Sequence, residues 1–182
     1  RTEGLNAILD VEIQCWAAEN SPLRLDRQPF TDFIEDGTLI VCPGDEVDFQ
    51  LIEDDLVELN NLCAIQTVAA DKTFVPQLLQ RLEQIHGMKA FAFTQSPRFY
   101  SAPIRAMQKM LSKKQLIHGN DRCLTWQAQN LTIKRNAKDE WMPDKAAGEL
   151  KIDAMVALLM AISEFFYHGS EQCNTDSAIS AL

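Results

Sequence analysis

Residues 64–94 read AIQTVAADKTFVPQLLQRLEQIHGMKAFAFT, and this stretch decides the fold class. Residues 64–70 form a short apolar run, typical of a buried strand, and Asp71 closes it. Residues 74–86 repeat leucine and isoleucine at helical spacing, and residues 88–94 form a second apolar run. Strand–helix–strand units of this length imply parallel pairing through a right-handed crossover. The stretch therefore predicts an α/β fold.

The same alternation of elements continues in both directions along the chain. Upstream, the patterns predict a half-buried strand, a short helix, a second strand and an amphipathic helix at residues 9–16, 29–36, 38–42 and 48–61. Downstream, they predict two helices, then a two-stranded ribbon or a loop, then a long apolar helix at residues 101–114, 122–130, 131–143 and 150–167. Pro103 is expected in the first turn of its helix, where proline is tolerated.

Length and composition exclude several classes of protein. The 182 residues suit one domain, and a composition of 46% hydrophobic and 24% charged residues is that of a globular protein. The formal net charge of -9 argues against a protein that coats nucleic acid by bulk charge, but it suits an enzyme whose acids bind Mg²⁺ or Mn²⁺. Five scattered cysteines show no zinc-ligand spacing, and the longest apolar run, residues 154–162, is too short to span a membrane.

Two acids stand at positions where a carboxylate is costly. Asp71 follows an apolar strand at the sheet edge where α/β proteins bind ligands, and Asp153 lies near the start of an apolar helix. Two carboxylates that converge there can hold divalent metal ions. The alternative is structural, because Asp71 can cap the following helix and Asp153 can be an acid favoured by the helix dipole.

A basic stripe follows one predicted helix. Its members are spaced by four, four and one residues, and they are Arg105, Lys109, Lys113 and Lys114. Such a stripe is either a solvated helix face or a surface that follows nucleic-acid phosphates. The sequence contains no GxxxxGK[ST] phosphate loop and no GxSxG nucleophile elbow.

Several motifs follow one another in order along the chain. They begin at Trp16 with an aromatic strand end, followed by a stretch that includes Pro29, Gly37 and Gly44. A strand ending in an acid follows at residues 68–71, and a glutamine turn at residues 94–96. The later motifs are LIHGN at residues 116–120, LTW at 124–126, Asn130, Lys145 and the most specific block, KIDAMVALLMA at residues 151–161. Together these motifs cover residues 16–167, and they resemble the nuclease domain of phage terminase large subunits.

The resemblance implies a fold, a reaction and a set of ligands. The fold is an RNase H-like mixed sheet flanked by helices. The activity is that of a divalent-metal-dependent endonuclease, which cuts concatemeric viral DNA during packaging and uses two Mg²⁺ or Mn²⁺ ions. Asp71 is the counterpart of the second metal-binding acid and Asp153 that of the third. The resemblance also favours contact between double-stranded DNA and the basic stripe, together with Lys145.

The same resemblance implies partners and a place of action. The partners are an upstream ATPase domain of the same polypeptide, a small terminase subunit and a portal protein. The place of action is the cytoplasm of a bacterial host, with no membrane involved. Residues 1–168 are expected to form a single nuclease domain that is truncated at its N-terminus, and residues 169–182 a flexible tail. A chain that starts at Arg1 without methionine suggests a fragment of a longer protein.

One departure from the family pattern concerns the first metal-binding acid. The family carries this acid on a central first strand, well upstream of the aromatic strand end, whereas only fifteen residues precede Trp16. Either that strand lies upstream of Arg1, which the order of the motifs favours, or Asp10 replaces the acid. Two alternatives to a packaging nuclease follow. One is an inactive fragment that binds DNA or packaging partners, and the other is a different RNase H-like nuclease, such as a junction resolvase.

Overall fold

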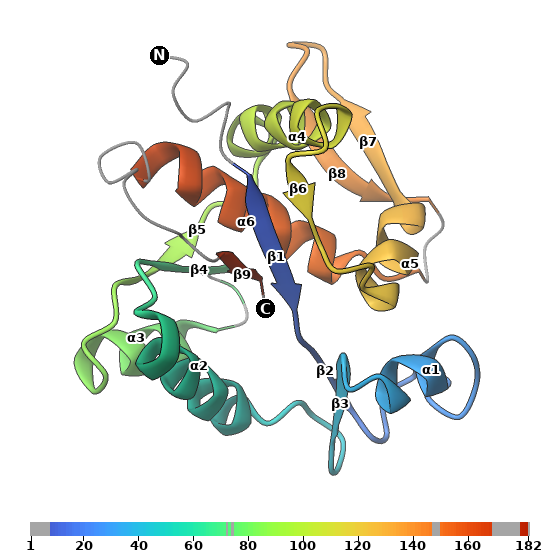
Figure 1. Ribbon diagram of the computed structural model, residues 1–182, viewed down its shortest axis with the longest axis vertical. Helices are drawn as coiled ribbons and strands as arrows, with labels where there is room; N and C mark the ends of the chain where they lie inside the picture. Colours follow the sequence, from blue (N-terminus) through green and yellow to red (C-terminus); the bar gives the residue numbers. More distant parts are fainter. Residues whose placement is uncertain (1–7, 72, 74, 147–149, 169–178, 182) are drawn as a thin grey trace.

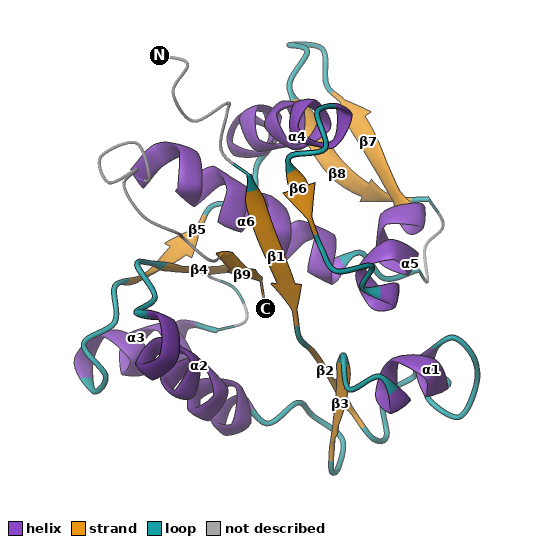
Figure 2. Ribbon diagram, in the orientation of Figure 1, coloured by secondary structure: helices purple, strands orange, loops and turns teal. Residues whose placement is uncertain are grey.

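The structure is a computed structural model that describes residues 8–71, 73, 75–146, 150–168 and 179–181. Figure 2 shows strands flanked by helices. The strands are β1 (Leu9–Ile13), β2 (Cys15–Ala18), β3 (Leu39–Cys42), β4 (Val68–Asp71), β5 (Ala90–Phe93), β6 (Leu116–Ile117), β7 (Leu131–Arg135), β8 (Trp141–Lys145) and β9 (Ile179–Ala181). The helices are α1 (Phe30–Glu35), α2 (Phe49–Cys63), α3 (Pro76–Gln84), α4 (Pro97–Ser112), α5 (Arg122–Asn130) and α6 (Asp153–His168).

The predicted strand–helix–strand unit is present. Strands β4 and β5 pair in parallel, with Val68 opposite Ala90 and Asp71 opposite Phe93, and α3 connects them. The mixed α/β class is also confirmed, because three strand groups pair in parallel while β7 and β8 form an antiparallel ribbon. Residues 131–143, predicted as either a two-stranded ribbon or a loop, therefore belong to a ribbon.

Within the described residues the strands do not form one continuous sheet. They form a three-stranded sheet in the order β6-β1-β9 and three separate pairs, β2-β3, β4-β5 and β7-β8. The predicted single strand at residues 9–16 is divided into β1 and β2. Its alternation is confirmed, since Leu9, Val11 and Ile13 are buried while Asp10 and Glu12 are exposed. The expected tail, residues 169–182, lies outside the described residues except for β9, which pairs with β1.

Two hydrophobic clusters pack together the helices and strands that surround the candidate site. The larger one joins β1, α4 and α6, which lie together in Figure 1. The second joins α2 and α3 to strands β4 and β5. Strand β4 contributes to both clusters, with Ala69 against the first and Val68 and Ala70 against the second. Alternate residues of a strand point to opposite faces, so β4 lies between the two helix layers.

Two local predictions need correction. Strand β4 is half-buried along its length rather than fully buried, because part of it borders a cavity described below. Helix α4 begins at Pro97, so Pro103 lies inside the helix and not in its first turn. Proline is favourable at the first helical position, and Pro97 sits there after Ser96, which explains the earlier start. No helix of the described residues is long and apolar enough to cross a membrane.

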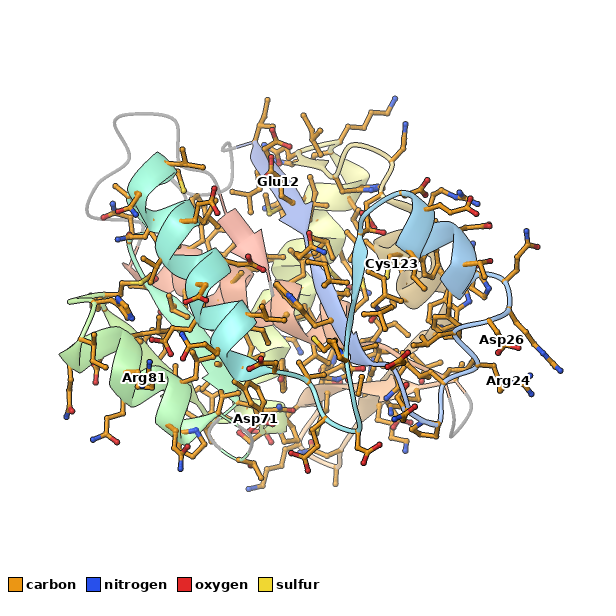
Figure 3. The ribbon with its side chains drawn as sticks, turned by 90° about the horizontal axis from the view of Figure 1, so that it is seen from below. Glu12, Arg24, Asp26, Asp71, Arg81 and Cys123 are labelled. Atoms are coloured by element: carbon orange, nitrogen blue, oxygen red, sulfur yellow. The ribbon has the colours of Figure 1, made fainter. Side chains whose placement is uncertain are left out.

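A buried ion cluster ties α2 to α3. Glu53 of α2 is 2% exposed, and its carboxylate accepts two hydrogen bonds from Arg81 of α3, at 2.6 and 3.0 Å. His86 Nε2 lies 2.7 Å from the Oε1 atom of Glu53. The hydrogen bonds from Arg81, assisted by His86, hold the pKa of Glu53 below its ordinary value of 4.5 in spite of burial. Figure 3 labels Arg81 on α3.

We expect Glu53→Gln to lower the free energy of unfolding at pH 7 by about 1.5–3 kcal/mol, the usual value of hydrogen bonds to a charged group. A lowered folded-state pKa stabilises the fold above the unfolded-state pKa, and this contribution disappears as the pH falls through the folded-state value. The difference between the wild type and the variant should therefore shrink between about pH 5 and pH 3 in urea titrations. Exposed Glu58→Gln, on the same helix, is the control. A difference that does not depend on pH would contradict the prediction.

Candidate functional site

A cavity of about 800 Å³ lies between strand β4, helices α2, α3 and α6, and strand β8. Its lining is largely apolar, with residues such as Leu56, Leu79 and Val156. Its charged and amide side chains are Asp71, Gln95, Lys134, Asp144, Lys145 and Asp153. The two acids predicted as metal ligands, far apart in the sequence, thus face one cavity, and Lys145 faces it with them.

Asp71 is the last residue of β4, at the carboxyl end of the strand. Its Oδ1 atom accepts a hydrogen bond from the Thr73 amide at 2.9 Å, and its Oδ2 atom accepts one from Gln95 Nε2 at 2.5 Å. Asp71 does not cap α3, whose N-cap residue is Val75. Burial raises the pKa of Tyr100, and the negative charge of Asp71 raises it further, which places the phenol near this carboxylate. Each carboxylate oxygen of Asp71 keeps a lone pair available for a cation.

Asp153 is the first residue of α6, which begins three residues later than the predicted start at residue 150. Its side chain is 73% exposed, and its Oδ2 atom lies 4.0 Å from Lys151 Nζ. An ion pair at this distance between exposed groups contributes little to stability. The positive end of the helix dipole also stabilises the carboxylate. Asp153 can therefore stabilise the start of α6 and bind a cation at the same time.

Asp144 of β8 is an acid that sequence reasoning did not single out. It lines the same cavity, and Lys134 of β7 donates to its Oδ2 atom at 2.7 Å. This hydrogen bond holds the pKa of Asp144 below its ordinary value of 3.8. The only signal in the sequence is that Asp144 precedes Lys145. This signal points to the cavity only once residues 131–145 are known to form a ribbon.

Asp10 lies elsewhere. It borders a separate hollow of about 520 Å³, together with Glu12, His118 and Asp121. Figure 3 shows Glu12 well away from Asp71. The structure therefore brings Asp71 and Asp153 to one cavity but does not bring Asp10 to it. Within the described part of the chain, no group of three or more His, Cys, Asp and Glu side chains is arranged to hold a metal ion.

The predicted basic stripe is only partly a free surface. Arg105 donates to the carbonyl and the carboxylate of Asp139 and lies 4.8 Å from the ring centre of Trp141. It therefore fastens α4 to the ribbon. Lys109 lies in the last turn of α4, while Lys113 and Lys114 follow the helix end at Ser112. These three lysines are exposed.

The oxygen ligands at the cavity fit a hard divalent cation. Mg²⁺ is usually bound by one or two carboxylates together with water and substrate phosphate, and Asp71 and Asp153 offer two carboxylates. A pair of cations needs further oxygen ligands, because each ion prefers six. The described residues thus fit one such cation more completely than two.

Known proteins resemble this chain in sequence. The family described as "Terminase large subunit, endonuclease domain" matches residues 15–169. The large terminase subunit of Enterobacteria phage HK97 is 23% identical over 140 residues, which is 76% of this chain and 28% of that protein. Protein YmfN of Escherichia coli is 24% identical over 164 residues, which is 88% of this chain and 36% of that protein. The chain thus spans about a third of the length of these relatives.

Two solved structures resemble the fold. The crystal structure of the HK97 bacteriophage large terminase matches with a TM-score of 0.70 and 23% identity, over 81% of this chain and 32% of that one. The large terminase nuclease from thermophilic phage G20c matches with a TM-score of 0.52 and 16% identity, over 69% of this chain and 64% of that one. These matches support the predicted RNase H-like fold.

Proposed function

Since the chain belongs to the family of terminase large subunit endonuclease domains, we propose that it hydrolyses DNA phosphodiester bonds with the help of Mg²⁺ or Mn²⁺. The observation that carries this proposal is the convergence of Asp71 and Asp153 on one cavity. The two carboxylates come from a strand end and a helix start in different parts of the chain.

In the proposed mechanism Asp71 and Asp153 bind the cation, which supplies a water of lowered pKa and neutralises developing negative charge when it is bound. The Gln95 amide and the Thr73 N–H orient the Asp71 carboxylate by their hydrogen bonds. Lys145, on the same cavity, is placed to neutralise a DNA phosphate. Two-cation catalysis is the finer form of this proposal, and it requires a further acidic ligand beyond these two.

We further propose that the substrate is double-stranded DNA handled during viral genome packaging in a bacterial cytoplasm. Exposed Lys109, Lys113 and Lys114 are the proposed contacts with its phosphates, and Arg105 contributes from the ribbon side. An ATPase domain, a small terminase subunit and a portal protein are the proposed partners. Cutting of concatemeric DNA is the proposed step for this domain.

A nicking assay tests the proposed function. The purified chain is incubated with supercoiled plasmid in 1–10 mM Mn²⁺ or Mg²⁺, concentrations of roughly the order that weak sites with few carboxylates require. We expect conversion to open-circular and linear forms, and complete loss of conversion in excess chelator. Cutting that persists unchanged in chelator would contradict metal-dependent hydrolysis. A preference for cruciform over linear DNA would instead favour a junction resolvase.

A second candidate function is a module that binds DNA or packaging partners without cutting. The observation that favours it is that, although Asp71, Asp144 and Asp153 all line the cavity, the described residues contain no group of three or more such side chains arranged to hold a metal ion. Salt-sensitive DNA binding without nicking in either metal would support this function. Because phosphate contacts dominate such binding, affinity should then fall steeply between low and physiological salt.

A further inference from the structure

Gln127 is a buried amide whose side chain reaches the start of α6. It lies on α5 and is 5% exposed. Its Oε1 atom accepts a hydrogen bond from the Ala154 N–H at 2.8 Å. This N–H belongs to the first turn of α6, where helix amides have no partner within the helix. Ala154 follows Asp153 directly, so Gln127 holds the peptide that joins these two residues.

The other end of the Gln127 amide is held by sulfur. Cys123, labelled in Figure 3, lies one turn earlier on α5, and Gln127 Nε2 lies 3.4 Å from its Sγ atom. The same nitrogen lies 3.8 Å from the Sγ atom of Cys15, in β2. The two sulfur atoms lie 3.8 Å apart. Sulfur is a weak acceptor that suits the amide nitrogen, so the oxygen end must face the α6 amide.

A second amide on the same face of α5 holds the other side of the segment. Asn130 is 7% exposed, and its Nδ2 atom donates to the Lys151 carbonyl at 3.2 Å. Residues three apart on a helix share a face, so Gln127 and Asn130 act on the same segment from one surface. The Lys151–Ile152 peptide and the Asp153–Ala154 peptide are thus fastened to α5 by side chains that are themselves buried.

This arrangement matters because the Asp153 side chain has little else to orient it. The carboxylate is 73% exposed, and its ion pair with Lys151 spans 4.0 Å. Its position therefore depends on the backbone at residues 151–154. The buried amides of Gln127 and Asn130, each hydrogen-bonded to that backbone, set it more firmly than an exposed lysine can.

We propose that Gln127 is a positioning residue for Asp153, fixing the start of α6 so that the Asp153 carboxylate faces the cavity that Asp71 also lines. This inference rests on the proposed function, in which Asp153 binds the cation. Removal of groups that orient a metal ligand typically lowers metal affinity or activity by about 10- to 100-fold. We call the Gln127 and Asn130 side chains, with their hydrogen bonds to residues 151–154, the clamp. The thiols of Cys15 and Cys123 hold the amide nitrogen of Gln127 and so support it.

The test compares Gln127→Met, which keeps the length of the side chain but removes both hydrogen bonds, with Gln127→Glu, which keeps the acceptor for the Ala154 N–H. Gln129→Met, exposed on the same helix, is the matched control. Mn²⁺ affinity, the kcat and KM of nicking and hydrogen exchange of the Ala154 amide are measured for each, with Asp153→Asn alongside. All assays are run well below the melting temperature of each variant.

For Gln127→Met we expect Mn²⁺ affinity and kcat to fall by about 10- to 100-fold while the KM for DNA stays within about 2-fold. Exchange at Ala154 should be about 5- to 10-fold faster, as for a lost helix cap. Gln127→Glu should recover most of the Mn²⁺ affinity, and Gln129→Met should match the wild type. A purely structural role would lower the melting temperature without this loss of metal affinity.

Two outcomes would overturn the inference. The first is faster exchange at Ala154 in Gln127→Met with wild-type Mn²⁺ affinity and cutting. The second is Gln127→Glu behaving no better than Gln127→Met in metal binding. Failure of the proposed function has a different signature, because Asp153→Asn would then bind Mn²⁺ and cut like the wild type, whatever the exchange rate at Ala154 shows.

Discussion

Asp153→Asn should reduce Mn²⁺-dependent nicking by at least about 100-fold, because loss of a metal ligand exceeds the loss expected from its supporting residues. The substitution keeps the size of the side chain and replaces one carboxylate oxygen with an amide nitrogen. Asp153 is 73% exposed and begins α6, so little packing changes with it. The expected loss is therefore one of chemistry and not of folding.

The measurement is the initial rate of plasmid nicking at several Mn²⁺ concentrations, together with direct Mn²⁺ binding. Asp55→Asn, an exposed acid on α2, is the matched control and should nick like the wild type. The melting temperature of Asp153→Asn should stay within about 2 °C of the wild type, as for most surface substitutions. Equal nicking by Asp153→Asn and the wild type would refute the assignment.

The same assay addresses the first acid of the family pattern. If Asp10 supplied it, Asp10→Asn would lose nicking as Asp153→Asn does. The separate hollow around Asp10 instead leads us to expect a rate within about 3-fold of the wild type, typical of a surface substitution. If the wild type cuts DNA and only the substitution of Asp71 or Asp153 abolishes cutting, the result would support hydrolysis with two carboxylate ligands.

The sequence was sufficient where local pattern decides structure. The β4–α3–β5 unit follows from two apolar runs around a helical repeat, and its parallel pairing is confirmed. Asp71 and Asp153 were singled out because a carboxylate at a strand end or on an apolar helix is costly without a partner. Their shared cavity needed the structure, because it depends on how α6 packs against β4.

The sequence was insufficient where a residue acts through a distant partner. Gln127 reads as an ordinary polar position on a helix, and only burial together with Asn130 three residues later hints at a role. Its partners, Cys15 and Ala154, come from β2 and α6, which no local pattern relates to α5. The divided sheet was equally hidden, because strand patterns predict strands and not which strands pair.

Leu159→Ala should lower the free energy of unfolding by about 2–5 kcal/mol, the cost of an apolar cavity in a packed core. Leu159 is completely buried on α6, in the cluster that joins this helix to β1 and α4. It does not line the cavity that holds Asp71 and Asp153. The midpoint of urea unfolding measures the loss, and Leu62→Ala, 78% exposed on α2, should change it by less than about 0.5 kcal/mol.

This pair of variants separates the stability of α6 from the placement of Asp153. If the Gln127 and Asn130 amides of α5 set the start of α6, Leu159→Ala should keep nearly wild-type Mn²⁺ affinity under conditions where the variant is folded. The reason is that the space left by the Leu159 side chain lies farther along α6 than the residues that these amides hold. Gln127→Met should show the opposite pattern, with a larger loss of metal affinity than of stability. Equal losses of unfolding free energy in Leu159→Ala and Leu62→Ala would contradict the packing of Leu159 in the cluster that joins α6 to β1 and α4. A parallel loss of Mn²⁺ affinity in folded Leu159→Ala would mean that core packing, rather than the clamp, positions the carboxylate.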